Sequence, residues 1–147
     1  IFILLLILVI FMRVKDIMHN VTKISSDVVV SEAASIMDQK QVGSMLVEKD
    51  DKIVGIMTEK DILKKIVAKG KNPDVLRVKD IMSYPIITID ANEHILGASR
   101  KLDKHRIRRL IVIENKKIIG KVTSNSISRN LKYSLAKYGS VYTRPEY

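Results

Sequence analysis

The feature that most constrains the fold of this chain is an internal repeat that runs through nearly all of it. Residues Val14–Met18 read V-K-D-I-M, and the same five letters return at Val78–Met82, sixty-four residues later. After one additional residue near Pro85 the offset becomes sixty-five and stays there. The pairs that match at this offset include Ile24 and Ile89, Ala33 and Ala98, Val47 and Val112, Gly55 and Gly120, Thr58 and Thr123, and Ile62 and Ile127. Self-similarity at a fixed period predicts two copies of one structural unit.

Each copy of the repeat predicts the same succession of elements. Those expected in the first copy are an extended piece at Thr22–Ser25, a helix at Ser31–Lys40, strands at Met45–Val47 and Ile53–Met57, and a helix from Thr58 to about Lys69. The second copy repeats this with strands at Leu110–Ile113 and Ile118–Val122 and a helix from Thr123. Ser31 is the expected N-cap of the first helix, and Gly70 is the expected end of the second.

The order strand-helix-strand-strand-helix in each copy belongs to the mixed α/β (α+β) class. A three-stranded sheet cannot bury both of its faces within one copy, so we expect two repeats packed sheet to sheet with pseudo-two-fold symmetry. The tail should continue the last helix and end loosely, with Gly139 and Pro145 as breakers. The expected boundaries are residues 1–12 for an apolar leader, 13–70 for the first repeat, 71–77 for a linker, 78–132 for the second repeat and 133–147 for a basic tail.

The apolar leader, Ile1–Met12, reads IFILLLILVIFM and ends at Arg13. As a helix, twelve residues reach about 18 Å, short of the roughly 30 Å hydrocarbon layer of a bilayer, so we expect no membrane partner. The segment also lacks the basic start and the cleavage site of a secretory signal. Three interpretations stay open: a start artefact with Met12 as the natural initiator, a helix buried against a partner subunit, and a membrane-proximal remnant.

Composition argues against an enzyme. The chain has no cysteine, which excludes disulfides, thiolate nucleophiles and cysteine-ligated metals and is typical of a cytoplasmic protein. The three histidines have no metal-ligand spacing, so we expect no metal site. No histidine–carboxylate pairing, catalytic carboxylate pair or Walker-type lysine loop is evident. We therefore expect no catalytic residues and no required cofactor.

The net charge of +10 is unevenly spread along the chain. Residues 13–70 carry ten Lys/Arg against nine Asp/Glu, or +1, whereas residues 71–147 carry sixteen against seven, or +9. A basic half of this kind is compatible with a nucleic-acid-binding protein, which is the alternative function that we consider. The basic residues are interleaved with ordinary helix and strand patterning and form no long run, which favours a solvated surface instead.

A second repeated motif, G-x-x-T-x-x-D, suggests a ligand. In the first copy it covers Gly55–Asp61, and Thr58 opens the predicted helix. A helix N-terminus suits phosphate, whereas a carboxylate such as that of Asp61 repels phosphate and suits vicinal hydroxyls such as a ribose diol. Gly55 has no Cβ and so allows another backbone or a ligand to come close. The Thr-x-x-Asp pair also forms a capping box worth about 1 kcal/mol, so local sequence leaves cap and ligand site both open.

With these motifs, residues from Arg13 to about Lys132 resemble the CBS-domain family, named after cystathionine β-synthase. The resemblance rests on the V-K-D-I-M openings, on the strand–turn–strand ending in glycine, and on G-x-x-T-x-x-D at the same place in two aligned copies. It implies a regulatory, energy-sensing module that binds AMP, ADP, ATP or S-adenosylmethionine in the cleft between the repeats. It also implies a homodimer that signals to an unidentified regulated protein.

The resemblance assigns roles to individual residues. It implies that Asp61 holds the ribose and that a basic residue at a strand start, Arg108 or Arg109, faces the phosphates; exposed arginines that discourage edge aggregation are the alternative. Ser126 replaces the aspartate in the second copy, so we expect two unequal clefts with the Asp61 cleft the tighter. The expected ligand-binding residues are Gly55, Thr58, Asp61, Ile86, Ile87 and Thr88 for one cleft, Val21, Thr22, Thr123 and Ser126 for the other, and Arg108 and Arg109 for phosphate.

Overall fold

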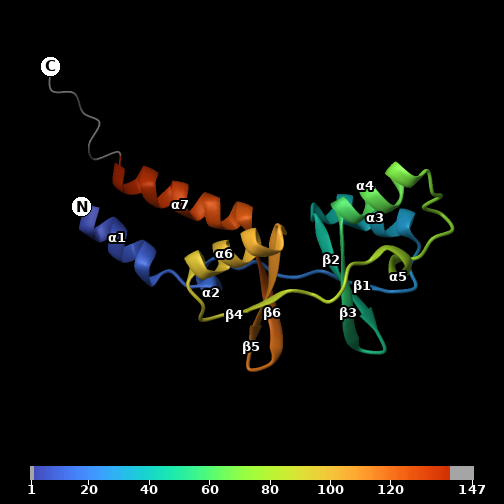
Figure 1. The fold of residues 1–147 in the computed structure, drawn as a ribbon, viewed down its shortest axis with the longest axis horizontal. Coiled ribbons are helices and arrows are strands. Elements are labelled where there is room, and N and C mark those ends of the chain that lie inside the picture. The colour runs from blue at the N-terminus through green and yellow to red at the C-terminus, as the bar shows by residue number, and fades with distance from the viewer. Residues whose placement is uncertain (1, 140–147) are drawn as a thin grey trace, which may run out of the picture. The chain divides into compact units, whose positions relative to one another are not determined.

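A computed structural model of the chain describes residues 2–139 and contains two compact units (Figure 1). Unit 2 comprises Val21–Ile86, and unit 1 joins the described residues that precede and follow it. Each unit holds one three-stranded sheet with helices, which confirms the mixed α/β class predicted from the repeat.

Unit 2 is built on the strands of the first repeat. Its elements are β1 (Lys23–Ser25), α3 (Val30–Lys40), β2 (Ser44–Lys49), β3 (Lys52–Thr58), α4 (Glu59–Lys65), the 3-10 helix η1 (Val67–Lys69) and α5 (Val78–Ile81). The sheet has the order β1-β2-β3, with β1 parallel and β3 antiparallel to β2. The β2–β3 hairpin turns at Asp50 and Asp51, whose φ angles of 49° and 60° are those of a type I′ turn.

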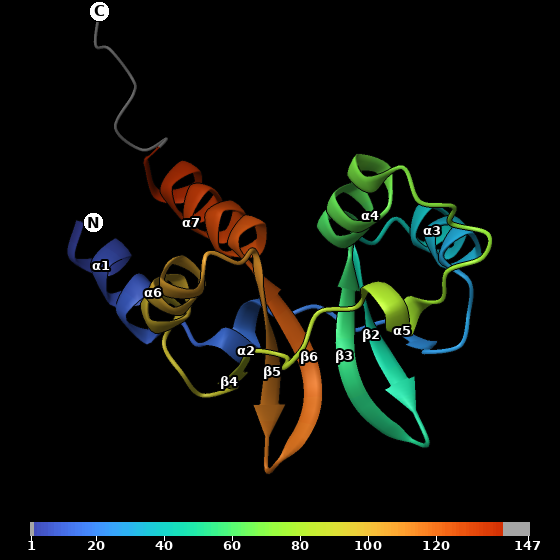
Figure 2. The ribbon, with the colours of Figure 1, turned by 45° about the vertical axis from the view of Figure 1, so that its right-hand side comes forward.

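Unit 1 repeats this plan on the strands of the second repeat. Its elements are α1 (Phe2–Phe11), α2 (Val14–Ile17), β4 (Thr88–Asp90), α6 (Ile95–His105), β5 (Arg109–Glu114), β6 (Lys117–Thr123) and α7 (Ser124–Gly139). The sheet order β4-β5-β6 has the same parallel and antiparallel pairings. Helices α6 and α7 lie side by side, away from the turn of the β5–β6 hairpin (Figure 2).

The core of each unit is completed by the V-K-D-I-M segment of the other repeat. Helix α5 opens the second repeat but packs in unit 2, where the Val78 N–H donates to the Val28 carbonyl at 2.9 Å. Helix α2 opens the first repeat but packs in unit 1, where the Val14 N–H donates to the Glu93 carbonyl at 2.9 Å. The compact units are therefore out of step with the sequence repeats.

The predicted helices and strands of both copies are present, with bounds shifted by a few residues. The N-cap prediction for Ser31 is wrong, because α3 begins at Val30 after Val29 and has no side-chain cap. The Val30 N–H donates instead to the Leu76 carbonyl at 2.9 Å, and the Ser31 N–H donates to the Pro73 carbonyl at 3.1 Å. Carbonyl groups of the linker thus accept hydrogen bonds from the first amides of α3, which a capping side chain would otherwise accept.

The second helix of the first copy divides into two parts. Helix α4 ends at Lys65, and η1 then leads to Gly70, whose φ of 59° ends the segment as predicted. In the tail, α7 continues to Gly139 as expected, and the predicted loose end lies outside the described residues. The short helices α2 and α5 and the leader helix α1 are not among the sequence-based predictions.

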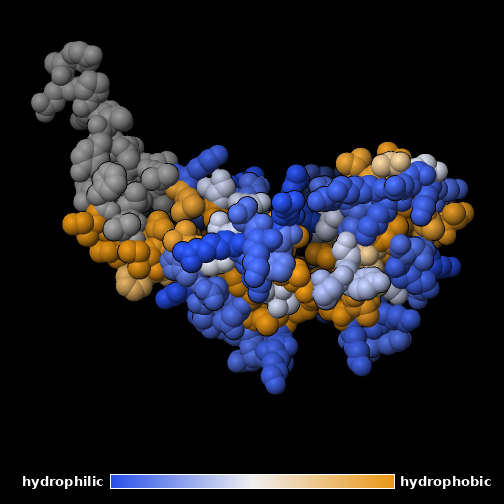
Figure 3. Space-filling model, viewed as in Figure 1, coloured by the Kyte–Doolittle hydropathy of each residue, from blue (hydrophilic) through white to orange (hydrophobic). Residues whose placement is uncertain are grey.

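The leader forms helix α1, which contacts α7 within unit 1. Among its described side chains, Ile3, Ile7, Ile10 and Phe11 are between 44% and 72% exposed. These residues contribute to a hydrophobic surface at the end of unit 1 (Figure 3). None of the helices in the described part of the chain is both long enough and apolar enough to cross a bilayer.

Candidate functional site

The G-x-x-T-x-x-D motif of unit 2 forms a closed capping box at the start of α4. The Thr58 N–H donates to Asp61 Oδ2 at 2.9 Å, and the Asp61 N–H donates to Thr58 Oγ1 at 3.2 Å. The Thr58 hydroxyl also donates to Asp61 Oδ2 at 2.9 Å. The capping interpretation of this motif therefore describes the conformation observed, because the aspartate side chain turns back onto its own helix start.

The other carboxylate oxygen of Asp61 is also occupied. Oδ1 accepts a hydrogen bond from the Ser83 hydroxyl at 2.7 Å and lies 2.9 Å from the Lys65 ammonium. Burial of Asp61, which is 6% exposed, raises the pKa of its carboxyl, but hydrogen bonds from Lys65, Ser83 and Thr58 outweigh that effect and lower the pKa below its usual value. With two donors on each oxygen, the carboxylate has its acceptor positions filled.

Lys65 extends this network to the last residue of α5 and to the segment that follows this helix. Its ammonium donates to the Ile81 carbonyl at 2.7 Å and lies 3.3 Å from the Ser83 hydroxyl. The predicted close approach at Gly55 involves the same segment, because a Cβ on this glycine would lie 2.8 Å from the Ser83 carbonyl oxygen and 2.8 Å from Met82 Sδ. The space beside Gly55 is therefore filled by protein rather than open to a ligand.

Unit 1 carries the matching motif without the charge. The Thr123 N–H donates to Ser126 Oγ at 2.9 Å, and the Ser126 N–H donates to Thr123 Oγ1 at 3.0 Å. Ser126 is buried, as Asp61 is, but its hydroxyl donates to the Thr123 carbonyl at 2.8 Å. Asn130, which stands where Lys65 stands in the first copy, donates to the Ser126 carbonyl at 2.8 Å. This cap has no counterpart to the Lys65 ion pair.

Two cations lie together on one face of the unit 1 sheet. Arg109 pairs with Thr123 across β5 and β6, and Ile111 pairs with Lys121, so the Arg109 and Lys121 side chains project from the same face. Burial, and secondarily the Arg109 charge, lowers the pKa of the Lys121 ammonium. Lys121 forms no ion pair with a described carboxylate. The described residues of unit 1 thus place two partly buried positive charges on one face of the sheet.

The sequence analysis did not identify Lys121 as a site residue, although comparing the two copies of the repeat shows that it replaces an uncharged residue. At the offset of sixty-five its counterpart in the first copy is Ile56, and the counterpart of Arg109 is the buried Ser44. Both cations therefore replace uncharged residues. Of the two arginines proposed to face phosphate, Arg108 precedes β5 and is exposed, whereas Arg109 is the first residue of β5 and is partly buried.

The structure distributes the predicted ligand-binding residues between the two units. Those in unit 2 are Val21, Thr22, Gly55, Thr58, Asp61 and Ile86, and those in unit 1 are Ile87, Thr88, Arg108, Arg109, Thr123 and Ser126. Within unit 2, the Leu46 N–H donates to the Thr22 carbonyl at 2.8 Å, and within unit 1 the Ile111 N–H donates to the Ile87 carbonyl at 3.0 Å. Each first-strand segment thus lies on the sheet of its own repeat, and the predicted crossed clefts stay a prediction.

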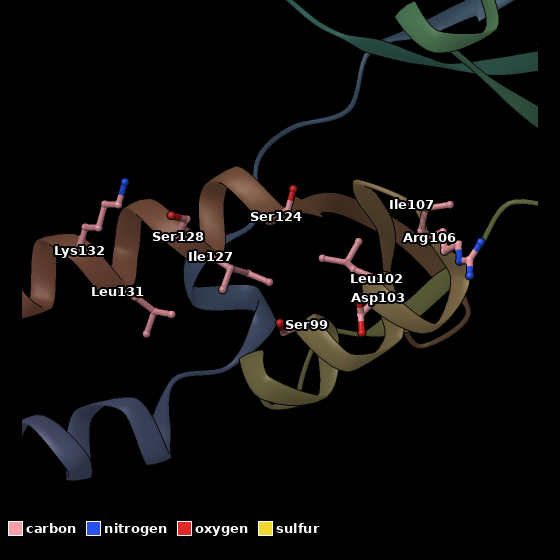
Figure 4. Close-up of a pocket in the computed structure, with 10 residues that line it drawn as sticks. All are labelled: Ser99, Leu102, Asp103, Arg106, Ile107, Ser124, Ile127, Ser128, Leu131 and Lys132. Carbon is pink, nitrogen blue, oxygen red and sulfur yellow. The ribbon is translucent and has the colours of Figure 1, made fainter. Parts of the chain in front are cut away.

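Unit 1 also contains a cavity of about 480 Å³ between α6 and α7 (Figure 4). Its apolar lining comes from Leu102, Ile107, Ile127 and Leu131. The polar lining residues are Ser99, Asp103, Arg106, Ser124, Ser128 and Lys132. None of the predicted ligand-binding residues lines this cavity.

Histidine and carboxylate side chains of the described residues form no group of three or more that could hold a metal ion. His94 instead caps α6: its Nδ1 accepts a hydrogen bond from the Leu96 N–H at 3.1 Å, and its Nε2 lies 2.8 Å from the Val9 carbonyl oxygen. This histidine therefore serves the local fold of unit 1.

The sequence profile of the CBS domain matches residues 14–68 and 78–133, which are the two copies of the repeat. The chain belongs to the CBS-domain family. Proteins of this family are generally regulatory modules that bind small-molecule ligands and oligomerise.

Several curated proteins share this CBS pair. The chain is 39% identical over 107 residues to an uncharacterised protein of Methanopyrus kandleri, and the match covers 71% of the chain and 55% of that protein. It is 30% identical over 118 residues to the CBS domain-containing protein YhcV of Bacillus subtilis, covering 80% of the chain and 84% of YhcV. A homoserine O-acetyltransferase of Methanohalobium evestigatum is 35% identical over 119 residues, covering 79% of the chain and 23% of the enzyme. The chain thus matches about half of the first relative and less than a quarter of the enzyme.

Solved structures of CBS-domain proteins share the fold. An uncharacterised protein of Pyrococcus horikoshii has a TM-score of 0.77 and 27% identity, covering 93% of the chain and 97% of that protein. A hexameric CBS-CP12 protein from bloom-forming cyanobacteria has a TM-score of 0.75 and 30% identity, covering 80% of the chain and 67% of that protein. These similarities agree with the mixed α/β architecture of a CBS pair.

Proposed function

We propose that this CBS pair is a non-catalytic regulatory module that binds a phosphorylated adenosine ligand and signals the occupancy to a partner protein as a homodimer. The observation that carries the proposal is the Arg109–Lys121 pair. Burial of the Lys121 ammonium beside the charge of Arg109 is unfavourable, and an anion placed against Lys121 reverses that cost. Arginine and lysine are also the side chains that most often recognise phosphate in proteins.

The adenosine part of the ligand is proposed from the family resemblance. AMP, ADP and ATP carry the phosphate that the cation pair would bind, and S-adenosylmethionine, which carries none, is the alternative candidate. Asp61 can accept a ribose diol only if the diol replaces the Ser83 hydroxyl or the Lys65 ammonium, which occupy Oδ1. In unit 1 the Ser126 hydroxyl is likewise bonded within its own cap but forms no ion pair, and Lys121 and Arg109 are on the same sheet as Thr123. We therefore place the tighter phosphate contact in unit 1, whereas the sequence favoured the Asp61 cleft.

A titration of adenosine, AMP, ADP, ATP and S-adenosylmethionine tests this proposal by calorimetry and thermal shift. Affinity should rise with the number of phosphates, and a ligand at a hundred times its dissociation constant should add about 2.7 kcal/mol to stability. Lys121→Ile, which installs the residue of the first copy, should reduce the advantage of ATP over adenosine about tenfold, or about 1.4 kcal/mol. The control, Lys117→Ala, changes an exposed lysine on the same strand and should leave it unchanged.

Two results would oppose the proposal. If no adenosine compound changes the melting temperature of the wild type, the chain is not an adenosine sensor. If Lys121→Ile leaves the ratio of ATP to adenosine affinity intact, the cation pair is not where phosphate binds.

The charge of unit 1 favours a second candidate, nucleic-acid binding. The sequence of unit 1 carries fifteen Lys/Arg against six Asp/Glu, whereas that of unit 2 carries eleven against ten. Binding of this kind would weaken steeply with salt, because phosphate contacts release counterions. Fluorescence anisotropy with labelled single- and double-stranded oligonucleotides at several salt concentrations separates the two functions, since a nucleotide sensor requires Lys121 and shows little affinity for the polymer.

A further inference from the structure

His19 pairs with Lys121 along the edge of β6 that β5 does not occupy. The His19 N–H donates to the Lys121 carbonyl at 2.8 Å, and the Lys121 N–H donates to the His19 carbonyl at 2.8 Å. Two residues that exchange both bonds in this way stand directly opposite each other, with Cα atoms about 5.5 Å apart and side chains on the same face of the sheet. His19 therefore lies on the face of unit 1 that carries Lys121 and Arg109.

The two units differ in charge at three equivalent positions on this face. The counterparts in unit 2 are Ser83 for His19, Ile56 for Lys121 and Ser44 for Arg109. Ser83 forms the same backbone bridge with Ile56, so the equivalence holds in the structure as well as in the sequence. Each uncharged residue of unit 2 is thus replaced in unit 1 by a side chain that carries or can accept a proton.

Unit 1 also lacks the carboxylate that this position meets in unit 2. There, the Ser83 hydroxyl donates to Asp61 Oδ1 at 2.7 Å. In unit 1 the aspartate is replaced by Ser126, whose hydroxyl donates to the Thr123 carbonyl at 2.8 Å. His19 is exposed, and within residues 2–139 its ring has no hydrogen bond or ion pair. No carboxylate of the α7 cap therefore neutralises a proton on this ring.

The elements around His19 keep its surroundings basic. These elements are α2, which His19 follows, the strands β5 and β6, and α7, which contacts α2. Their charged residues in the described part of the chain are Lys15 and Asp16 on α2, Arg109 and Glu114 on β5, Lys117 and Lys121 on β6, and Arg129 and Lys132 on α7. Of the two carboxylates, that of Asp16 accepts the Arg13 N–H at 2.7 Å, and Glu114 lies at the other end of β5 from Arg109.

We infer that His19 is the third group that holds phosphate in unit 1, together with Arg109 and Lys121, so that a proton on its ring strengthens binding. The inference rests on the proposed function, because it takes the face of this cation pair as the place where phosphate binds, and it adds regulation by pH. Histidine ordinarily changes its charge between about pH 5 and 8. An imidazolium donates charge-assisted hydrogen bonds to phosphate oxygens, whereas the neutral ring donates an uncharged one. Affinity for phosphate therefore falls as the pH rises through this range.

Titrations of the full chain at about pH 6 and pH 8 measure this linkage. The probes are ATP, followed by calorimetry, and inorganic sulfate, which keeps a constant charge over this range and is followed by the NMR shifts of backbone amides. The wild type should bind sulfate about tenfold more tightly at the lower pH. The ratio of wild-type to His19→Gln affinity for ATP should fall by the same factor from the lower to the higher pH, since the titration of ATP itself cancels in the ratio.

Three variants identify the group that takes the proton. His19→Gln should bind sulfate at both pH values as weakly as the wild type does at the higher one. His19→Lys, which keeps its charge, should bind sulfate tightly at both. The control is His105→Gln, which changes an exposed histidine at the end of α6 and should keep the wild-type response to pH.

The outcomes separate this inference from the proposed function. If the wild type binds ATP and His19→Gln keeps the full response to pH, the inference is wrong and the adenosine proposal stands; loss of that response in Lys121→Ile would then assign the proton to Lys121. If His19→Gln abolishes a pH response to sulfate in a chain that binds no adenosine compound, the inference holds for an anion site and the adenosine proposal fails. Binding of neither ATP nor sulfate at the lower pH would overturn both.

Discussion

Replacing Asp61 tests whether its carboxylate holds unit 2 together. In the Asp61→Ala variant, the capping box at α4 loses its return hydrogen bond, which costs about 1 kcal/mol. The partly buried Ser83 and Thr58 donors also lose a charged acceptor, a loss of about 1.5–3 kcal/mol before relaxation. The Lys65 side chain is 42% exposed and can be hydrated, so its lost ion pair adds little. The expected destabilisation is about 3 kcal/mol, or about 6–12 °C in melting temperature for a chain of this size.

Urea unfolding followed by circular dichroism measures this loss, and Ser126→Ala is the matched control. Ser126 occupies the same position in the cap of α7 but forms no ion pair, so its replacement should cost about 1 kcal/mol. The slope of free energy against urea should stay constant in both variants, because neither changes the surface exposed on unfolding. If Asp61→Ala costs no more than Ser126→Ala, the network around Asp61 does not stabilise unit 2, and the reasoning is wrong.

Two further predictions follow from pH and from backbone contact. Hydrogen bonds lower the pKa of the Asp61 carboxyl below its unfolded value of about 3.9, so the carboxylate stabilises the fold above that pH, and this contribution is lost as the pH falls through the folded pKa. In acid unfolding scans, the stability advantage of the wild type over Asp61→Asn should therefore shrink below about pH 4. An advantage that stays constant down to pH 2 would contradict this pKa assignment. Gly55→Ala and Gly120→Ala should each lower the melting temperature, since the new Cβ would lie 2.8 Å from the carbonyl oxygen of Ser83 or His19, and Gly70→Ala is the contrasting case with open space but a φ of 59°.

Much of the fold could be predicted from the sequence, because the patterns that specify it lie within short segments and occur in both copies of the repeat. Alternation and turn residues at Asp50–Asp51 and Asn115–Lys116 fix both hairpins, and Thr58 and Thr123 begin their helices as expected. The two copies carry the same pattern, so each predicts the same elements independently. Segments whose partners are distant in sequence escaped prediction: α2 and α5 are only four residues long and are stabilised by the core of another repeat.

In the candidate site, too, local contacts could be predicted and contacts between distant parts of the sequence could not. The capping box of Thr58 and Asp61 could be predicted because its atoms come from one helical turn. The choice between cap and ligand could not, since it depends on Ser83, which is twenty-two residues from Asp61 in sequence and reaches it only because α5 packs in unit 2. Lys121 could not be predicted for a different reason. Its lowered pKa comes from burial beside Arg109, and the sequence gives the charge of a lysine but not its exposure.

The placement of α2 and α5 has a consequence for how such a chain could arise. A gene that encodes a single repeat would produce a protein whose opening helix has no place in its own core, and whose core lacks the helix that completes it. Two such proteins would fold only by exchanging these helices, which makes folding and pairing one concentration-dependent event. Fusing the two genes would turn that exchange into an intramolecular step at a high effective concentration. In the present chain, the exchange of α2 and α5 between the repeats takes place within one polypeptide.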